Sequence, residues 1–297
     1  MNTNLVKNIL LVLFGIITIA LGALILIQEN RYNLSAAQET AVVNLLEQNN
    51  IYLHGEIIRN FRPMRPMAME RYGYDRDGLA ARFFYGSEQP VNVYIEGNNM
   101  VFYTDDREMS YSYLDNIIVF EIPDGITNAA FAASPGGATA EQLAIEYIEA
   151  LMGMPPDMEL FSNTLDHFGN YIISFFTSYR GHILYNDHIR VRVTDRGITS
   201  IFYSRIHERN RGFVGEPHSI FSADEAMFAL LNHLRQKGVE GHVIINEMKL
   251  AYFLYEDGGQ SIGIPVYVFT IDLGRGLRFN YIFNAYTNED IRHEIIR

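Results

Sequence analysis

The residues best suited to metal chemistry are histidines, and one familiar spacing lies at the end of the chain. His293-Glu294-Ile295-Ile296-Arg297 begins like the helix of a zinc protease, but Arg297 stands where a second histidine ligand is required. His233 and His242 fall on opposite sides of the Lys237-Gly238 helix end, and the other histidines are scattered. We therefore expect no metal site, and His233 and His242 are the first residues to examine if zinc is found.

Other short motifs also fall short of a catalytic or cofactor site. Asp75-Arg76-Asp77-Gly78 begins like a calcium loop but lacks the later acidic ligands, so we interpret it as a turn. Gly274-Arg275-Gly276 lacks the third glycine of a phosphate-binding loop, which indicates a hairpin turn. The chain has no cysteine, which excludes disulfides and thiol nucleophiles. With no Gly-x-Ser-x-Gly motif either, the sequence predicts a protein that is not an enzyme and that holds no cofactor.

One motif suits binding rather than catalysis. Arg62-Pro63-Met64-Arg65-Pro66-Met67 is typical of a solvated Pro-rich loop, and a docking loop is the alternative. The net charge of the whole chain is −12, which repels phosphate backbones and disfavours a nucleic-acid partner.

Residues 9–27 predict a membrane anchor. This run contains no charged residue and no proline, and as a helix it spans roughly 28 Å, close to the hydrocarbon thickness of a bilayer. Lys7 and the amino terminus precede it, so we expect residues 1–8 in the cytoplasm and residues 28–297 outside. A cleaved signal peptide is the alternative, but the apolar run continues past Ala20-Leu21-Gly22, where a cleavage site would turn polar.

Three small residues give this predicted helix a possible partner-binding face. Gly15, Thr18 and Gly22 follow the spacing i, i+3, i+7 and therefore share one side of the helix. Small residues let a second helix approach closely in lipid, where packing drives association. We expect this face to contact another membrane helix; the alternative is that glycine is simply common in membrane helices.

Three capping boxes predict the starts of helices. They begin at Ser35, Thr139 and Ser222, and each has Gln or Glu three residues later. Behind the second and third boxes, apolar residues recur with the spacing of a helix that lies on a sheet, at an offset of 83 residues (139 to 222). These residues are Ala144, Tyr147, Ile148 and Leu151, matched by Met227, Leu230, Leu231 and Leu234.

Strand-like segments follow both of these helices. They are Tyr171–Phe176, His188–Val193 and Ile198–Tyr203, then Met248–Tyr255, Ile264–Ile271 and Leu277–Phe283. Tight turns separate them, which is typical of an antiparallel meander with a helix on one face. Residues 139–207 and 222–286 are therefore predicted to form two similar units of one C-terminal lobe, residues 138–297.

The segment before them is predicted to form a membrane-proximal α+β lobe, residues 28–133. Its expected strands are Ala80–Tyr85, Val91–Ile95, Met100–Tyr103 and Ile117–Phe120. Residues 128–138 contain Ser134-Pro135-Gly136-Gly137, and we place the lobe boundary in this small-residue linker. The expected fold class is α+β, with curved antiparallel sheets that carry helices on one face.

Several segments resemble a known family. Asn33-Leu34-Ser35 opens a helix that ends at Leu45-Leu46-Glu47-Gln48-Asn49-Asn50-Ile51, after one N-terminal anchor. Residues 181–189 (Gly-His-Ile-Leu-Tyr-Asn-Asp-His-Ile) precede a strand and hairpin, and Ile264-Pro265-Val266-Tyr267-Val268-Phe269 lies near the end. Together these segments resemble the YycH/YycI family, and YycI-type chains more closely because YycH-type chains are longer.

This resemblance implies a function. Such proteins are single-pass membrane proteins with extracytoplasmic α+β lobes. They bind and regulate a sensor histidine kinase that controls cell-wall metabolism in low-GC Gram-positive bacteria, so the implied partners are that kinase and a YycH-like regulator. The alternative is an extracytoplasmic ligand-binding or peptidase-inhibiting module, because the helix-plus-meander units also resemble PepSY-type domains.

Overall fold

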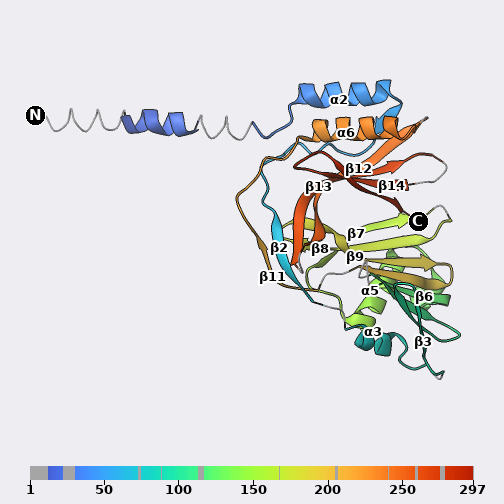
Figure 1. Cartoon of the computed structure of the whole chain (residues 1–297). Coiled ribbons are helices and arrows are strands. Elements are labelled where there is room, and N and C mark those ends of the chain that lie inside the picture. The colour runs from blue at the N-terminus through green and yellow to red at the C-terminus, as the bar shows by residue number, and fades with distance from the viewer. Residues whose placement is uncertain are drawn as a thin grey trace, which may run out of the picture.

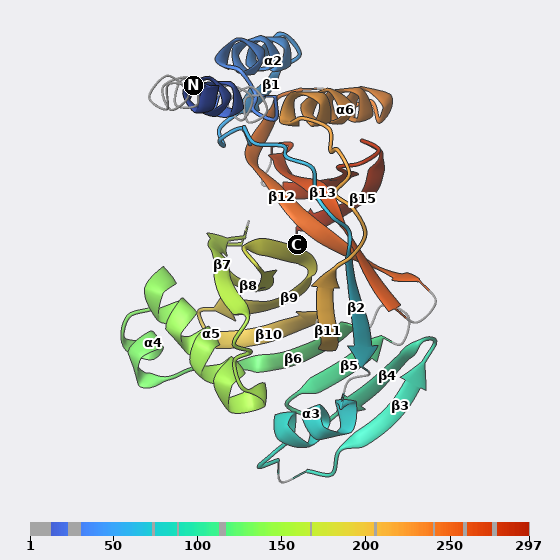
Figure 2. The ribbon, with the colours of Figure 1, turned by 90° about the vertical axis from the view of Figure 1, so that its left-hand side faces the viewer.

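The fold is a mixed α+β arrangement in which the strands join into one open, curved network (Figures 1 and 2). The computed structural model describes residues 13–22, 31–72, 75–87, 89–112, 117–166, 168–204, 207–239, 241–257, 260–274 and 278–296. The predicted cytoplasmic segment 1–8 and both ends of the predicted membrane span 9–27 lie outside these residues, and residues 13–22 are helical. Within the described part of the chain, no helix has both the length and the hydrophobicity needed to cross a membrane.

A large sheet forms one end of the body. Its described strands follow the order β7-β8-β9-β10-β6-β5-β4-β3, and all neighbours are antiparallel. Their bounds are β3 Asn92–Glu96, β4 Asn99–Tyr103, β5 Glu108–Ser112, β6 Ile117–Ile126, β7 Met158–Leu165, β8 Tyr171–Tyr179, β9 His182–Thr194 and β10 Gly197–Ser204. Three helices cover one face, namely α3 Arg76–Phe83, α4 Ala129–Ala133 and α5 Gly137–Met152 (Figure 2).

A small sheet forms the other end, with the order β1-β12-β13-β14-β15. Its bounds are β1 Ile51–Leu53, β12 Val243–Asp257, β13 Gln260–Asp272, β14 Arg278–Asn284 and β15 Asp290–Ile296. The pairing of β1 with β12 is parallel and the other pairings are antiparallel. Helices α2 (Ala36–Gln48) and α6 (Ala223–Gln236) lie side by side over this sheet (Figures 1 and 2).

Two strands connect the ends of the body. β2 (Met67–Tyr72) and β11 (His207–Phe213) pair with each other as an antiparallel ribbon, and β2 also pairs with β13. A single parallel contact, Tyr252 with Leu184, joins β12 to β9. The backbone network is therefore continuous from one end of the body to the other (Figure 2).

The predicted capping boxes are confirmed at α2 and α6. The Ser35 hydroxyl accepts from the Gln38 amide at 3.3 Å, and the Gln38 side chain accepts from the Ser35 amide at 3.1 Å. At α6, the Ser222 amide donates to the Glu225 carboxylate at 2.8 Å. These contacts satisfy amides that a helix start otherwise leaves without a partner.

The predicted capping box at Thr139 is wrong, because α5 begins at Gly137, three residues before Ala140, where that box would start the helix. Gly136 is the extended residue before the helix, and its amide donates to the Thr139 hydroxyl at 2.9 Å. Thr139 lies inside the first turn of the helix, and its hydroxyl provides the Gly136 amide with a hydrogen-bond acceptor. The apolar stripes behind both boxes do face cores, since the following residues are buried: Ala144, Ile148, Leu151, Met227, Leu230, Leu231 and Leu234.

The six strands predicted after these helices are all present, and the structure adds β7, β11 and β15. The strand predicted at Ala80–Tyr85 is wrong, because α3 occupies Arg76–Phe83. The Asp75 carboxylate accepts from the Gly78 amide at 3.0 Å, so the predicted turn at this point caps a helix. The predicted linker, residues 128–138, also contains helix α4.

The hydrophobic cores group the chain differently from the predicted lobes 28–133 and 138–297. Buried residues between 34 and 69 share one core with residues 220–285, whereas residues 79–131 share another with residues 140–203. The physical reason is that β1 pairs with β12, at Ile51 and Val243, which places α2 beside α6. A third cluster, including Phe176, Tyr185 and Phe253, packs the two sheets against each other.

Candidate partner-binding groove

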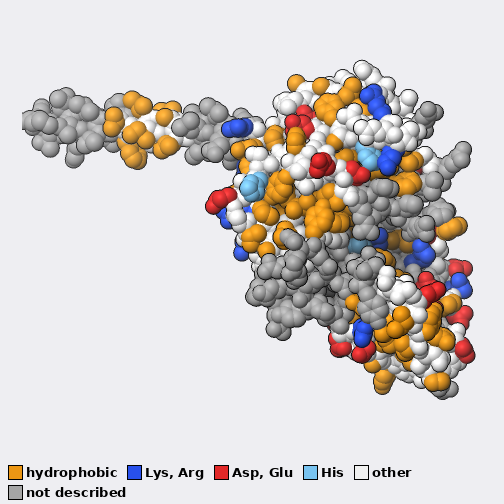
Figure 3. Space-filling model, in the orientation of Figure 1, with side chains coloured by type: hydrophobic (Ala, Val, Ile, Leu, Met, Phe, Trp, Pro, Cys, Tyr) orange, Lys and Arg blue, Asp and Glu red, His pale blue; other side chains and the backbone are white. Residues whose placement is uncertain are grey.

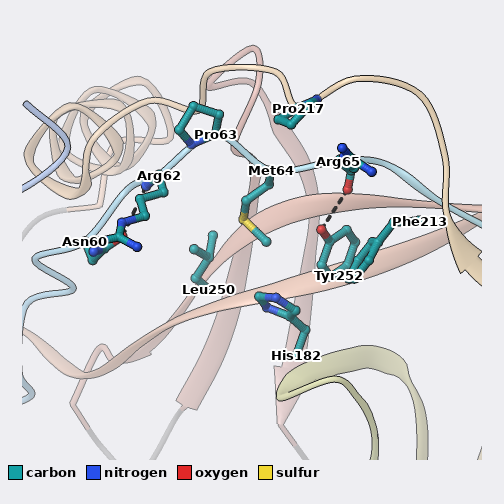
Figure 4. Close-up of a pocket in the computed structure, with 10 residues that line it drawn as sticks. All are labelled: Asn60, Arg62, Pro63, Met64, Arg65, His182, Phe213, Pro217, Leu250 and Tyr252. Carbon is teal, nitrogen blue, oxygen red and sulfur yellow. Dashed lines mark hydrogen bonds between the residues drawn. The ribbon is translucent and has the colours of Figure 1, made fainter. Parts of the chain in front are cut away.

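The Pro-rich run predicted as a loop lies in an extended segment, residues 60–66, that is anchored along its length. The Met64 amide donates to the His218 carbonyl at 2.9 Å, and the His218 amide donates back to the Met64 carbonyl at 2.8 Å. The Val214 amide donates to the Pro66 carbonyl at 2.9 Å. These bonds hold the segment in one extended path (Figure 4). A segment fixed in this way could act as the docking site that is the alternative to a solvated loop.

Two tyrosine hydroxyls hold the same segment by hydrogen bonds to its carbonyls. Tyr252 donates to the Arg65 carbonyl at 2.7 Å, and Tyr286 donates to the Met64 carbonyl at 2.9 Å. Burial raises the pKa of Tyr286 to about 12, and it raises the pKa of Tyr252 as well. Both hydroxyls therefore keep their protons at neutral pH and remain donors.

An open groove of about 410 Å³ lies beneath this segment (Figure 4). Its floor is apolar and comes from Leu250 and Tyr252 on β12 and from Phe213 on β11, while Met64 points down from the segment above. Hydrophobic side chains gather on this side of the body in Figure 3. The volume is within the range of pockets that bind small molecules or peptide side chains.

His182, the first residue of β9, provides a polar group at the bottom of the groove. Its ring meets Phe213 edge-on with centroids 5.9 Å apart, and it meets Tyr252 in the same way at 5.5 Å. Burial lowers the pKa of His182, so the imidazole is neutral at physiological pH. It therefore offers one hydrogen-bond donor and one acceptor.

Two arginines line the groove, and a third lies near Phe213 of its floor. Arg62 and Arg65 are exposed on the segment above it. Arg180 lies at the side, with its guanidinium 5.3 Å from the ring centre of Tyr179 and 5.8 Å from that of Phe213. The chain as a whole is acidic, so these arginines form a local region of positive charge. Such a region favours an anionic binding partner.

The lining chemistry suits recognition. The described residues that line the groove include arginines, a histidine and a tyrosine, but none of them is Asp, Glu, Ser or Thr. The groove can therefore bury apolar side chains, exchange hydrogen bonds with His182 and attract acidic groups. An extended peptide that alternates apolar and acidic side chains matches these properties.

The groove begins where the chain emerges from the predicted anchor. Asn60 pairs with Asn33, and the Phe61 amide donates to the Tyr32 carbonyl at 3.0 Å. Asn33 follows six residues after Ile27, the last residue of the predicted span, and six extended residues reach at most roughly 20 Å. If residues 9–27 span a membrane, the groove lies on the membrane-facing part of the body.

The predicted docking face of the anchor lies in the described helix 13–22. The Thr18 hydroxyl donates to the Phe14 carbonyl at 2.9 Å, one turn earlier in the same helix. A methyl group added at Gly15 or Gly22 would meet nothing within 4 Å. The small-residue face formed by these glycines is therefore not covered by other described residues.

The predicted metal-chemistry residues lie apart from the groove. His233 is 3.6 Å from Asp290, and His242 stacks on Tyr52 with ring centres 4.4 Å apart. Within the described ranges, no three His, Asp or Glu side chains come together as metal ligands do. His293 belongs to a strand, β15, which removes the helical spacing of a zinc protease. Of the predicted hairpin turn at 274–276, the last two residues lie outside the described part.

Sequence reasoning identified the upper side of the groove but missed its floor. His182, Phe213, Leu250 and Tyr252 come from three different strands and carry no local motif. Leu250 and Tyr252 belong to the predicted strand Met248–Tyr255, whereas His182 and Phe213 lie in no predicted strand. The pairing of those strands decides that they meet beneath residues 60–66.

Comparisons with known proteins give structural likenesses only. No protein family and no curated protein sequence matches the chain. An uncharacterised protein from Eubacterium rectale is similar over 86% of this chain and 98% of its own length, with 14% identity and a TM-score of 0.48. YycH from Bacillus subtilis covers 78% of this chain and 55% of its own, with 12% identity and a TM-score of 0.45. The C-terminal domain of Bacillus megaterium YpeB covers 76% and 99%, with 11% identity and a TM-score of 0.36.

Proposed function

We propose that this protein is a non-enzymatic, membrane-anchored regulator whose groove binds an extracytoplasmic segment of a membrane sensor histidine kinase. The observation that carries the proposal is the anchored segment 60–66, which roofs an apolar groove with arginines at its rim. The sequence resemblance described above supplies the kind of partner. The groove supplies a place for that partner to bind.

The position of the groove favours a partner in the same membrane. The segment that forms it pairs with Asn33, a few residues after the predicted anchor. The groove would therefore meet the membrane-proximal residues of a neighbouring membrane protein more often than its distant ones. The arginine rim favours a segment with acidic residues, and the apolar floor favours alternating apolar side chains.

Regulation by binding to this groove requires no catalysed reaction. A bound protein shifts a two-state kinase only by its different affinities for the two states, and about 1.4 kcal/mol changes their ratio tenfold. Gly15, Thr18 and Gly22 are proposed as a second contact, with a kinase membrane helix. The expected location is the cell membrane, with residues 1–8 in the cytoplasm and the body outside.

The first test reverses the charge of the groove rim in the full-length chain. We expect Arg62→Glu with Arg65→Glu to lower co-purification of the kinase from membranes at least tenfold and to change its autophosphorylation. The matched control is Arg82→Glu with Arg196→Glu, two exposed arginines on the large-sheet lobe, which should change neither. Unchanged kinase binding by the rim variant, with normal folding, would contradict the groove as the contact.

The second test separates the membrane helix from the groove. Gly15→Leu with Gly22→Leu fills the small-residue face and should also weaken co-purification while leaving the body folded. If neither this variant nor the rim variant affects the kinase, the proposed function is wrong. Stoichiometric zinc or a hydrolase activity in the purified chain would contradict the non-enzymatic part of the proposal.

A further inference from the structure

A second cavity, of about 120 Å³, lies between the two sheets, away from the groove. Strands β7, β8 and β9 of the large sheet form one wall, and β12, β13 and β14 of the small sheet form the other. It borders the cluster that packs the sheets together, because Phe176, Tyr185 and Val268 belong to both. A molecule bound there would contact both ends of the body.

The charges in this cavity are unbalanced. Its described lining includes three cations, Arg190, Lys249 and Arg278, and one carboxylate, Glu247. Lys249 lies 2.6 Å from Glu247, so this pair is neutral overall. Neither arginine forms an ion pair within the described part of the chain, and Arg190 lies 5.9 Å from the ring centre of Phe202. Two guanidinium groups, one from each sheet, therefore carry uncompensated positive charge beside the cavity.

The neutral polar groups in the wall are fixed in orientation. The Thr270 hydroxyl donates to the Asn280 side-chain carbonyl at 2.9 Å, and the Asn280 amide donates to the Tyr185 hydroxyl at 2.5 Å. Asn280 and Tyr185 are buried, and Ser174, also buried, lines the cavity beside them. Such a preorganised wall costs little entropy when a polar ligand binds.

We propose that this cavity binds a small organic anion whose carboxylate or phosphate group is held between Arg190 and Arg278. Guanidinium groups bind both kinds of oxyanion through paired hydrogen bonds. The volume equals the share of about four water molecules in the liquid, which limits the ligand to a few non-hydrogen atoms. Phe161, Ile172 and Phe176 form an apolar side of the cavity that suits a short hydrocarbon part. The ligand bridges the two sheets, and this site does not depend on the partner proposed for the groove.

Calorimetric titration of the full chain in detergent tests the site. The probes are butanoate, inorganic phosphate and butanamide, which is the uncharged equivalent of butanoate. We expect butanoate, phosphate or both to bind with one-to-one stoichiometry and butanamide not to bind. The stronger of the two anions identifies the oxyanion class. Failure of both anions to bind would overturn the proposal.

Substitutions then locate the binding. Arg190→Gln with Arg278→Gln should weaken anion binding at least tenfold, and Arg190→Lys with Arg278→Lys should give an intermediate affinity because the charge remains but the paired geometry is lost. The matched control, Arg196→Gln with Arg82→Gln, removes two exposed arginines and should bind as the wild type does. Equal loss in the control, or no loss in either cavity variant, would refute the site. If the glutamine variant does not fold, the lysine variant decides.

Discussion

Removing the two tyrosine hydroxyls that donate to carbonyls of residues 60–66 is the most direct test of how the groove is held. Tyr252→Phe and Tyr286→Phe each remove one oxygen and leave the ring that packs in the core. The Arg65 carbonyl loses its tyrosine donor, whereas the Met64 carbonyl loses one donor and keeps the His218 amide as the other. The perturbation is therefore confined to the path of one anchored segment.

The expected magnitude follows from the two hydrogen bonds. Each contributes about 0.5–1.5 kcal/mol, and the exposed position of Arg65 lets water replace part of the loss at its carbonyl. The double variant should therefore lose about 1–2 kcal/mol in the free energy of local opening, a fall in amide protection of roughly fivefold to thirtyfold. The two effects should not add fully, because both hydroxyls hold the same rigid segment.

Hydrogen exchange provides the assay. The amides of Met64, Val214 and His218 close the backbone pairs of this segment, so their protection factors should fall most. Amides of α5, in the other core, should keep their protection. Tyr85→Phe is the matched control, since this tyrosine is 86% exposed. Unchanged protection at Met64 and His218 in the double variant would refute the conclusion that the hydroxyls anchor the segment.

Three further predictions concern the rest of the body. Burial raises the pKa of Tyr286 and Tyr255 to about 12, so the fold favours their protonated form. Their contribution to stability should be fully present below about pH 10 and should be lost as the pH rises from about 10 to 12, measured by urea unfolding at several pH values in this range. Ser222→Ala should cost about 1 kcal/mol because it removes the hydroxyl that donates to the Glu225 carboxylate at 2.8 Å and holds it at the start of α6, seen as a lower urea midpoint; an unchanged midpoint would show that Glu225 caps the helix alone. Phe269→Ala should cost about 3–5 kcal/mol in calorimetry because the ring is fully buried, whereas Phe228→Ala, at a residue 40% exposed, should cost far less.

Local chemistry made several elements predictable from the sequence. The caps at Ser35 and Ser222 depend on a side chain and an amide three residues apart. The apolar stripes of α5 and α6 follow from the helical period, which fixes one buried face whatever that face meets. α3 was not predicted, because the apolar run at its end resembled a strand. The structure forms a helix there, and Asp75 caps its start.

The site depended on contacts that the sequence does not encode locally. The predicted docking alternative at Arg62–Met67 identified the segment above the groove, but the floor residues Phe213, Leu250 and Tyr252 meet only because β11, β2, β13 and β12 pair in that order. Periodicity specifies which face of a strand is buried and leaves open which strand lies beside it. The parallel pairing of Ile51 with Val243 placed α2 beside α6 for the same reason. The sequence thus determined two helix caps, the apolar faces of α5 and α6 and the six strands that follow them, and the tertiary pairing of distant strands decided the cores, the groove and the cavity between the sheets.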